Sequence, residues 1–415
     1  MSFFLKNKWI FIVTFMIALG AAASFTTQWV LVLFYSKEDF GFFSGVFGAT
    51  QIGLQITVFG THHFLLSRSK SGSHRLWMHQ CSLLYVALAA FFAIMAFIFC
   101  CFFGLFSNKY LIFWFWMAFS VPSVLAYVFF QIEENKTAIA YWPFAQLLLR
   151  LFMVYIAALI GVPIEYQSVF FAASAFIFFI YTFFLYKDFL SKHFSKASNI
   201  SWYRLKLLIK SSFPYFTHEF FEKADLRVAL PMSVALLGGS VAADVAITIS
   251  VLLAILLVPQ SLFQRYFLAR MHQWARTDYH RLSKFVFRCV LLLLFFSLAL
   301  VFFISPFLEW GIVVVFGESY RSSIDLLQVT LFVPAFLLSS NALCNLFLSN
   351  ERILVLQKIQ IIWFLIFMLM MVLLTTKFGA LGVCYALLFG RLIYLIFILM
   401  NLYDFSKLAS IENQL

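Results

Sequence analysis

A cluster of ionisable side chains interrupts the apolar stretch 213–237, FPYFTHEFFEKADLRVALPMSVALL. Within ten residues it contains His218, Glu219, Glu222, Lys223, Asp225 and Arg227. Carboxylates and an imidazole can exchange protons, and carboxylates can bind Na⁺. Lys and Arg bind anions, and the Arg guanidinium suits two-pronged contacts with phosphate. Which chemistry applies depends on whether this segment crosses a membrane or lies outside it.

The composition shows that lipid is the main solvent of this chain. Of its 415 residues 64% are hydrophobic and 11% are charged, whereas a soluble domain has about 25% charged residues. Several apolar runs exceed the ~18 residues that span a bilayer, and spanning segments must be helical because lipid offers the backbone no partners. The alternation typical of a β-barrel is absent. We therefore expect an all-α polytopic membrane protein.

The net charge of +12 fits the retention of Lys and Arg on the cytoplasmic side and does not indicate nucleic acid. The six Cys lie in apolar runs without CxxC spacing, so we expect no metal site and no cofactor. Ala21, Ala22 and Ala23 imitate a signal-peptide cleavage site. The apolar run continues to Tyr35, which is too long for a signal core, so we expect a first transmembrane helix.

Two ways of threading the chain compete, and the positive-inside rule separates them. If 213–237 crosses the membrane, Lys and Arg divide 21 inside to 4 outside, whereas a surface helix at 213–227 gives 16 to 11. The first threading predicts twelve spans with both termini in the cytoplasm. The expected spans are 9–35, 40–66, 80–106, 110–130, 138–160, 168–186, 213–237, 241–263, 286–308, 323–348, 353–375 and 379–402.

The charged groups of 218–227 then enter the bilayer, where each Asp, Lys or Arg costs ~2.5–3.5 kcal/mol. They must face protein or a water-filled cavity. Lys223 and Arg227 follow Glu219 at four-residue intervals, so the three lie on one side of a helix whose opposite side is mostly apolar. Pro214 and Pro231 bracket this region and could bend the helix.

The spans divide into two sets of six, a parallel pseudo-repeat. Weak sequence echoes, such as SHRLWMHQCSLLYVALAAFF (73–92) with YHRLSKFVFRCVLLLLFFSL (279–298), support a duplication. We expect four parts: an N-terminal lobe at 1–190, a basic cytoplasmic linker at 191–210, a C-terminal lobe at 211–403 and a cytoplasmic tail at 404–415.

Three segments carry a family resemblance. They are KEDFGFFSGVFGATQIGLQITVFG (37–60), FGESYRSSIDLLQVTLFVPAF (316–336) and FGALGVCYALLFGRL (378–392). They resemble segments of bacterial polysaccharide or O-antigen repeat-unit flippases of the Wzx type, within the multidrug/oligosaccharidyl-lipid/polysaccharide (MOP) exporter superfamily.

The resemblance implies a MATE-like fold, with two six-helix lobes around a cavity lined by helices 1, 2, 7 and 8. It implies that undecaprenyl-pyrophosphate-linked oligosaccharides move from the cytoplasmic to the periplasmic leaflet of the bacterial inner membrane. The partners would be the lipid-linked oligosaccharide, the bilayer and other polysaccharide assembly proteins, namely a polymerase and a chain-length regulator.

The candidate site residues fall into two groups. We expect anion contacts from the cations within the spans, Lys223, Arg227, Arg150 and Arg391. Candidates for H⁺ or Na⁺ coupling are Glu219, Glu222, Asp225, His218 and Asp244. Each Arg could instead be structural, bonded to backbone carbonyls, and Glu219 could simply pair with Lys223.

Alternative functions remain open. A cation-coupled drug antiporter of the same superfamily would need a net acidic cavity. Four buried cations face four buried acids, Glu219, Glu222, Asp225 and Asp244, so the charge balance alone does not decide. A membrane polysaccharide polymerase or ligase would need a sizeable outer loop, and the longest outer connection, about 309–321, is short. HExxH, Walker A and GxSxG motifs are absent. We therefore expect a transporter and not an enzyme.

Overall fold

The computed structural model describes residues 8–61, 64–65, 112–133, 135–194, 202–262, 271, 274, 278–349 and 353–412. All regular secondary structure in these ranges is helical. Nine helices among the described residues are long and apolar enough to span a membrane. The expectation of an all-α polytopic membrane protein is confirmed. The expected span 80–106 lies outside the described residues.

The helices of the first half are α2 (Lys8–Phe34), α3 (Lys37–Val58), α6 (Ile112–Ile132), α7 (Lys136–Leu159) and α8 (Gln167–Phe194). Those of the second half are α9 (Trp202–Leu237), α10 (Gly239–Leu262), α12 (Tyr279–Ile304), α13 (Leu308–Phe316), α14 (Ser323–Thr330), α15 (Val333–Ser349), α16 (Ile353–Phe378) and α17 (Ala380–Glu412). Short 3-10 turns are η3 (Ile164–Tyr166), η5 (Ser305–Phe307) and η6 (Glu318–Tyr320).

Local sequence signals set several helix ends. The side chains of Ser36, Asn135 and Asp278 accept hydrogen bonds from backbone N–H groups in the first turns of α3, α7 and α12. Gly238 and Gly379 adopt positive φ angles of 84° and 60°, which glycine permits at low cost. They allow α9 to turn directly into α10 and α16 into α17.

The charged segment is part of one helix, α9, which runs for 36 residues through Pro214 and Pro231. It begins at Trp202, within the stretch expected to be a linker, and it packs against α3, α10, α16 and α17. α9 therefore lies inside the bundle, as the threading with 213–237 as a span requires. The boundaries of the two lobes and of the linker remain predictions.

Two segments are divided into shorter helices that the hydropathy pattern does not predict. The span 323–348 is divided into α14 and α15. The outer connection 309–321 contains most of α13 and all of η6. Hydropathy cannot detect such breaks, because the residues at the break, Leu331 and Phe332, are themselves apolar.

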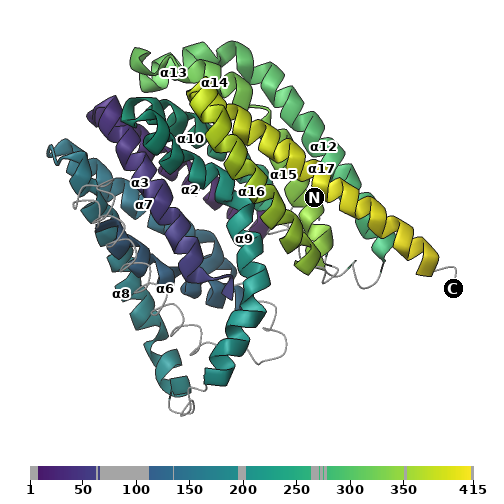
Figure 1. Ribbon diagram of the computed structural model, residues 1–415. Helices are drawn as coiled ribbons and strands as arrows, with labels where there is room; N and C mark the ends of the chain where they lie inside the picture. The colour runs from purple at the N-terminus through teal and green to yellow at the C-terminus, as the bar shows by residue number, and fades with distance from the viewer. Residues whose placement is uncertain are drawn as a thin grey trace.

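The helices form two groups that meet along four of them (Figure 1). In the first group α2 packs on α7, and α6 packs on α8 and α3. In the second group α16 packs on α17 and α9, and α12 packs on α15. α3 joins the groups by packing on α9 and α10, and α2 contacts α10. These four helices are the expected first, second, seventh and eighth spans.

A row of small residues on α3 lets the two groups approach closely. A Cβ atom at Gly41 would overlap the carbonyl oxygen of Gly239 on α10, and one at Gly45 would overlap the side chain of Val234 on α9. Such small-residue faces are how membrane helices gain packing contacts where lipid offers no hydrophobic drive. The glycines of α3 therefore fix its distance from the second half.

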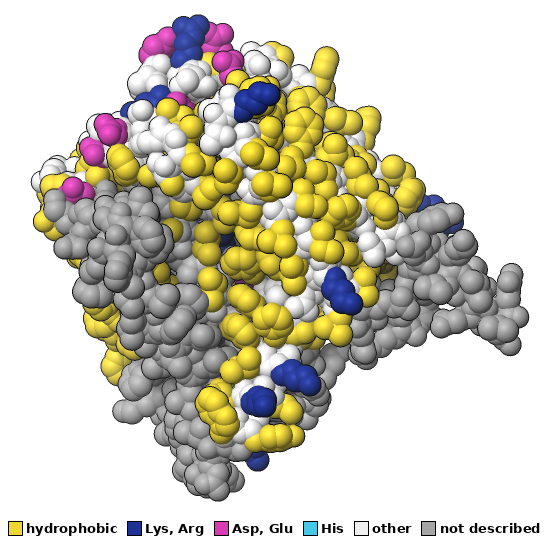
Figure 2. Space-filling view, in the orientation of Figure 1, with side chains coloured by type: hydrophobic (Ala, Val, Ile, Leu, Met, Phe, Trp, Pro, Cys, Tyr) yellow, Lys and Arg dark blue, Asp and Glu magenta, His cyan; other side chains and the backbone are white. Residues whose placement is uncertain are grey.

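The outer surface matches a lipid environment. Figure 2 shows a broad hydrophobic face, with acidic side chains gathered at the end where α13 and α14 lie. On α12, Phe295 is 76% exposed, Phe302 77% and Phe303 69%. In water a continuous patch of this kind would cause association, so these side chains indicate contact with lipid.

Candidate functional site

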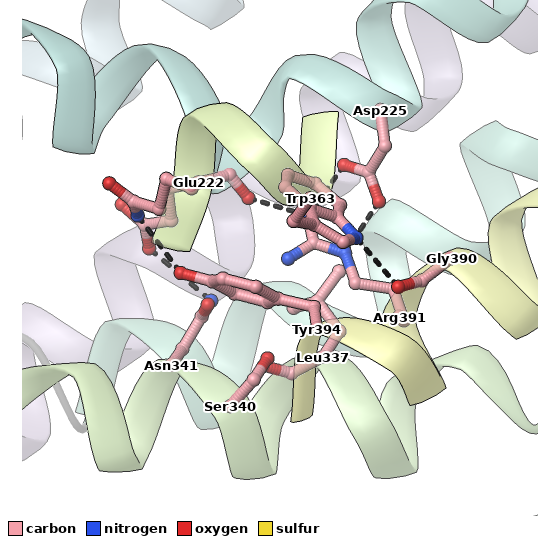
Figure 3. Close-up of polar contacts among 10 residues, drawn as sticks. Glu222, Asp225, Leu337, Ser340, Asn341, Trp363, Gly390, Arg391 and Tyr394 are labelled. Carbon is pink, nitrogen blue, oxygen red and sulfur yellow. Dashed lines mark hydrogen bonds and ion pairs between the residues drawn. The ribbon is translucent and has the colours of Figure 1, made fainter. Parts of the chain in front are cut away.

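A buried ion pair inside the bundle joins α17 to α9 (Figure 3). Arg391 Nε lies 2.5 Å from Asp225 Oδ2, and Arg391 Nη2 lies 2.5 Å from Asp225 Oδ1. Nη2 also donates to the carbonyl oxygen of Glu222, at 2.7 Å. Both charged side chains are fully excluded from solvent. This is the two-pronged geometry that makes an Arg–carboxylate pair strong.

Aromatic rings and further polar groups surround the pair. The Arg391 guanidinium lies 4.9 Å from the ring centre of Trp363 on α16 and 5.7 Å from that of Tyr394. Trp363 Nε1 donates to the carbonyl oxygen of Gly390, at 2.6 Å. Nothing in the sequence pattern singled out Trp363, because one Trp in an apolar run normally indicates packing.

The network continues from the pair towards α15 and α16. Asn341 Nδ2 donates to Glu222 Oε1, at 3.3 Å. Gln360 Nε2 donates to the Tyr394 hydroxyl, at 2.9 Å, and lies 3.1 Å from His218 Nδ1. Three of the expected coupling residues, His218, Glu222 and Asp225, thus lie in two hydrogen-bonded groups between α9, α15, α16 and α17, which adjoin where the Arg391 guanidinium contacts the Tyr394 ring.

Arg391 and Asp225 are therefore each other's ion-pair partner in this structure. Their charges are neutralised inside the second half, and neither side chain is open to a ligand in this conformation. The contact ties α9 to α17 at a depth where an unpaired charge is costly. The substrate role expected for Arg391 and the coupling role expected for Asp225 remain predictions.

Lys223 and Arg227 are placed differently from Arg391. Both are partly buried on α9. Arg227 Nη1 donates to the carbonyl oxygen of Gln51 on α3, at 3.3 Å. Among the described residues Lys223 forms neither a hydrogen bond nor an ion pair, so the pair with Glu219 that the spacing allows is not formed. Neither cation has a carboxylate partner at ion-pair distance in the part of the chain that the structure describes.

Arg150 on α7 lies within the first half. Its Nη2 donates to Ser24 Oγ on α2, at 3.2 Å. The guanidinium lies 5.9 Å and 5.2 Å from the ring centres of Phe47 and Phe171. Its Nε is buried and has no hydrogen-bond acceptor. Within the described ranges this side chain has no ion-pair partner either, so its positive charge is held by rings and one hydroxyl.

Asp244 on α10 lies at the end of the bundle that carries α13 and α14, away from the other coupling candidates. Lys37 Nζ lies 2.8 Å from Asp244 Oδ1, and Ser322 and Ser323 donate to the same carboxylate. Burial and the charge of Asp244 raise the pKa of the nearby Tyr320 hydroxyl to about 12. Tyr320 therefore stays neutral at physiological pH.

The ion pairs change the charge balance of the interior. Asp225 is neutralised by Arg391 and Asp244 by Lys37. Besides His218, the described ionisable candidates outside these pairs are the cations Arg150, Lys223 and Arg227, and the acids Glu219 and Glu222. The balance of four against four that the sequence suggested thus becomes three cations against two acids, because Lys37 was not among the four cations counted. No group of three or more His, Cys, Asp or Glu among the described residues could hold a metal ion.

Comparisons with known proteins were made on sequence and on structure. No protein family model matches the chain, and no curated protein matches it. Solved structures do match. The lipid II flippase MurJ, in an inward closed conformation, superposes with a TM-score of 0.68 at 13% identity, over 95% of this chain and 87% of MurJ.

Two MATE transporters match as well. An inward-facing multidrug resistance transporter of the MOP superfamily has a TM-score of 0.65 at 12% identity, over 96% of each chain. A mutant of the Vibrio cholerae transporter VcmN has a TM-score of 0.60 at 14% identity, over 96% of this chain and 97% of VcmN. The chain has the MATE/MurJ-like fold. The expected fold is thereby confirmed, whereas the resemblance to Wzx-type flippases is not matched by any of these structures.

Proposed function

We propose that the protein is a transporter that moves oligosaccharides linked to undecaprenyl pyrophosphate from the cytoplasmic to the periplasmic leaflet of a bacterial inner membrane, by alternating access. Two kinds of transporter share this fold, lipid-linked flippases such as MurJ and drug antiporters of the MATE type. The proposal takes the first kind and extends it to repeat units of O-antigen, capsule or exopolysaccharide. Both chain termini would face the cytoplasm.

One observation favours an anionic cargo over a cationic drug, and it is the excess of cations over acids among the interior candidates outside the Asp225–Arg391 and Asp244–Lys37 pairs. Arg150, Lys223 and Arg227 have no carboxylate at ion-pair distance among the described residues, whereas two of the interior acids are neutralised. A pyrophosphate crossing a bilayer unaided would expose its charge to hydrocarbon. Cations that replace water around the phosphates compensate that charge. The Lys223 ammonium can bind an anion without first breaking an ion pair within the protein.

The remaining chemistry follows from the same positions. Lys223 and Arg227 on α9 would contact the phosphates, and Arg150 on α7 would contact a second anionic group. The lipid tail would stay in the membrane. Glu219, Glu222 and His218 are the coupling groups of the proposal, for H⁺ or Na⁺, because Asp225 is held by Arg391 in this conformation.

The test is genetic replacement in the native host. Deletion of the gene should abolish the surface polysaccharide, and the wild-type gene should restore it. Lys223→Ala and Arg227→Ala should fail to restore it at equal protein levels. Lys210→Ala is the matched control, because Lys210 is an exposed cation on the same helix. Normal polymer from both site variants would remove these residues from the proposal.

The same strain separates the alternatives. Unchanged polysaccharide with altered drug tolerance in the deletion strain would favour a cation-coupled drug antiporter. Lipid-linked units that reach the periplasm but are never lengthened would favour a polymerase or ligase.

A further inference from the structure

A single lysine, Lys37, connects the two halves of the molecule at one end of the bundle. It is the first residue of α3, in the first half. Its Nζ forms the ion pair with Asp244 of α10 and donates to the carbonyl oxygen of Ser319, at 2.8 Å, and to Ser322 Oγ, at 3.3 Å. It also lies 5.1 Å from the ring centre of Tyr320. All four partners belong to the second half.

The carboxylate of Asp244 is oriented by residues of the second half other than Lys37. Ser322 Oγ donates to Asp244 Oδ2, at 2.8 Å, and Ser323 Oγ donates to Oδ1, at 3.0 Å. Asp244 is only 8% exposed, whereas Lys37 is 25% exposed. The second half thus holds a buried, oriented carboxylate, and the first half supplies the cation that neutralises it.

Closely packed backbones surround the pair. The overlap that a Cβ at Gly41 would cause lies one turn along α3 from Lys37, and it involves Gly239, at the start of α10. On the other side, Trp29 Nε1 at the end of α2 donates to the carbonyl oxygen of Val315 on α13, at 2.6 Å. At this end of the molecule α3 therefore packs on α10, and α2 packs on α10 and α13.

We propose that Lys37 and Asp244 are gating residues whose ion pair holds this end of the transport path shut. The inference rests on the proposed function, because alternating access requires this end to open at another stage of the cycle. Opening separates Lys37 from Asp244 and leaves a buried carboxylate with only its two serine donors. The pair therefore sets the fraction of molecules that are open at this end, which under the expected threading faces the periplasm.

The experiment measures opening directly and needs no transported substrate. Ala246→Cys, with the six native Cys replaced, places a thiol on α10 among buried residues that pack against α2 and α3. A membrane-impermeant maleimide is added to intact cells, and the labelling rate reports the open fraction. Loss of about 1.4 kcal/mol from the closed state corresponds to a tenfold higher open:closed ratio. We expect Lys37→Met and Asp244→Asn each to raise the labelling rate roughly tenfold.

Two controls distinguish the loss of the Lys37–Asp244 ion pair from a general loosening of the helix packing. Lys377→Met removes a cation at the end of α16 that is no part of this contact, and it should leave the labelling rate unchanged. The swap Lys37→Asp with Asp244→Lys should bring the rate back towards that of the parent, whereas either half of the swap alone should raise it. If Lys37→Met reduces the amount of folded protein, Lys37→Arg should keep the slow rate and the folded level.

An unchanged labelling rate in Lys37→Met and Asp244→Asn would overturn the gating role of this pair. A charge-swapped variant that is labelled as fast as its two single variants would overturn it as well. Neither result depends on which cargo is carried. If the wild-type gene fails to restore the polysaccharide while the labelling rates are as expected, the result would count against the proposed cargo and not against the gating role of Lys37 and Asp244.

Discussion

Removing one partner of the buried Asp225–Arg391 pair should destabilise the protein, and removing the other partner as well should not destabilise it further. In Asp225→Asn the guanidinium keeps the carbonyl oxygen of Glu222 and its contacts with the rings of Trp363 and Tyr394. In Arg391→Met the carboxylate loses both of its hydrogen bonds from Arg391. Breaking a buried pair from one side costs about 3–5 kcal/mol. We expect Asp225→Asn near the lower figure and Arg391→Met near the upper one.

The double variant is the informative one. With both charges gone, no unpaired ion is left at this position, and buried pairs replaced on both sides are often nearly neutral in stability. We expect the double variant to be at least as stable as Arg391→Met, with a coupling free energy of at least about 3 kcal/mol in a double-mutant cycle. The free energy of unfolding is measured by titrating SDS into purified protein in mixed micelles.

The matched control is Arg321→Gln, because Arg321 also pairs with carboxylates but is 59% exposed. Its free energy of unfolding should equal that of the wild type. The reasoning would be refuted if either single interior variant unfolded like the wild type, or if the effects of the single variants simply added.

Three further outcomes follow from the packing. Gly41→Val should destabilise the protein by about 1–3 kcal/mol, because its side chain collides with Gly239, whereas Gly311→Ala on α13, where no atom is near, should cost less in the same SDS titration. Trp363→Phe should cost about 1–3 kcal/mol, because the carbonyl oxygen of Gly390 loses its donor; a stability equal to the wild type would contradict this. Arg150→Met should leave stability unchanged or raised, because it removes an interior charge without a carboxylate partner, while it lowers polysaccharide complementation; loss of stability would count against that account.

Much of the fold could be predicted because helix formation and partitioning into the membrane depend on short segments of the sequence. The distribution of Lys and Arg favoured 213–237 as a span, and α9 lies inside the bundle, as expected of a span. The extension of α9 back to Trp202 and the break between α14 and α15 could not be predicted. Both depend on which neighbouring helices cover the backbone, and a hydropathy pattern does not contain that information.

The candidate site was predictable in its residue types but not in its pairings. All the interior cations and acids could be named from the sequence, since a charge in an apolar run is conspicuous. Their grouping could not, because Asp225 and Arg391 are 166 residues apart and meet only through the packing of α9 on α17. Lys37 gave no signal at all, because a Lys at a membrane-helix end is ordinary.

The chain's composition and the order of its apolar runs were enough to predict an all-helical membrane protein with charges buried in the segment 213–237, since both properties follow from how single segments partition between water and lipid. Which of those charges cancel, and which stay available to a cargo, depended on the three-dimensional packing. A charge within a bilayer is governed by its nearest neighbour in space, and α9 takes those neighbours from α3 and α17, at opposite ends of the chain.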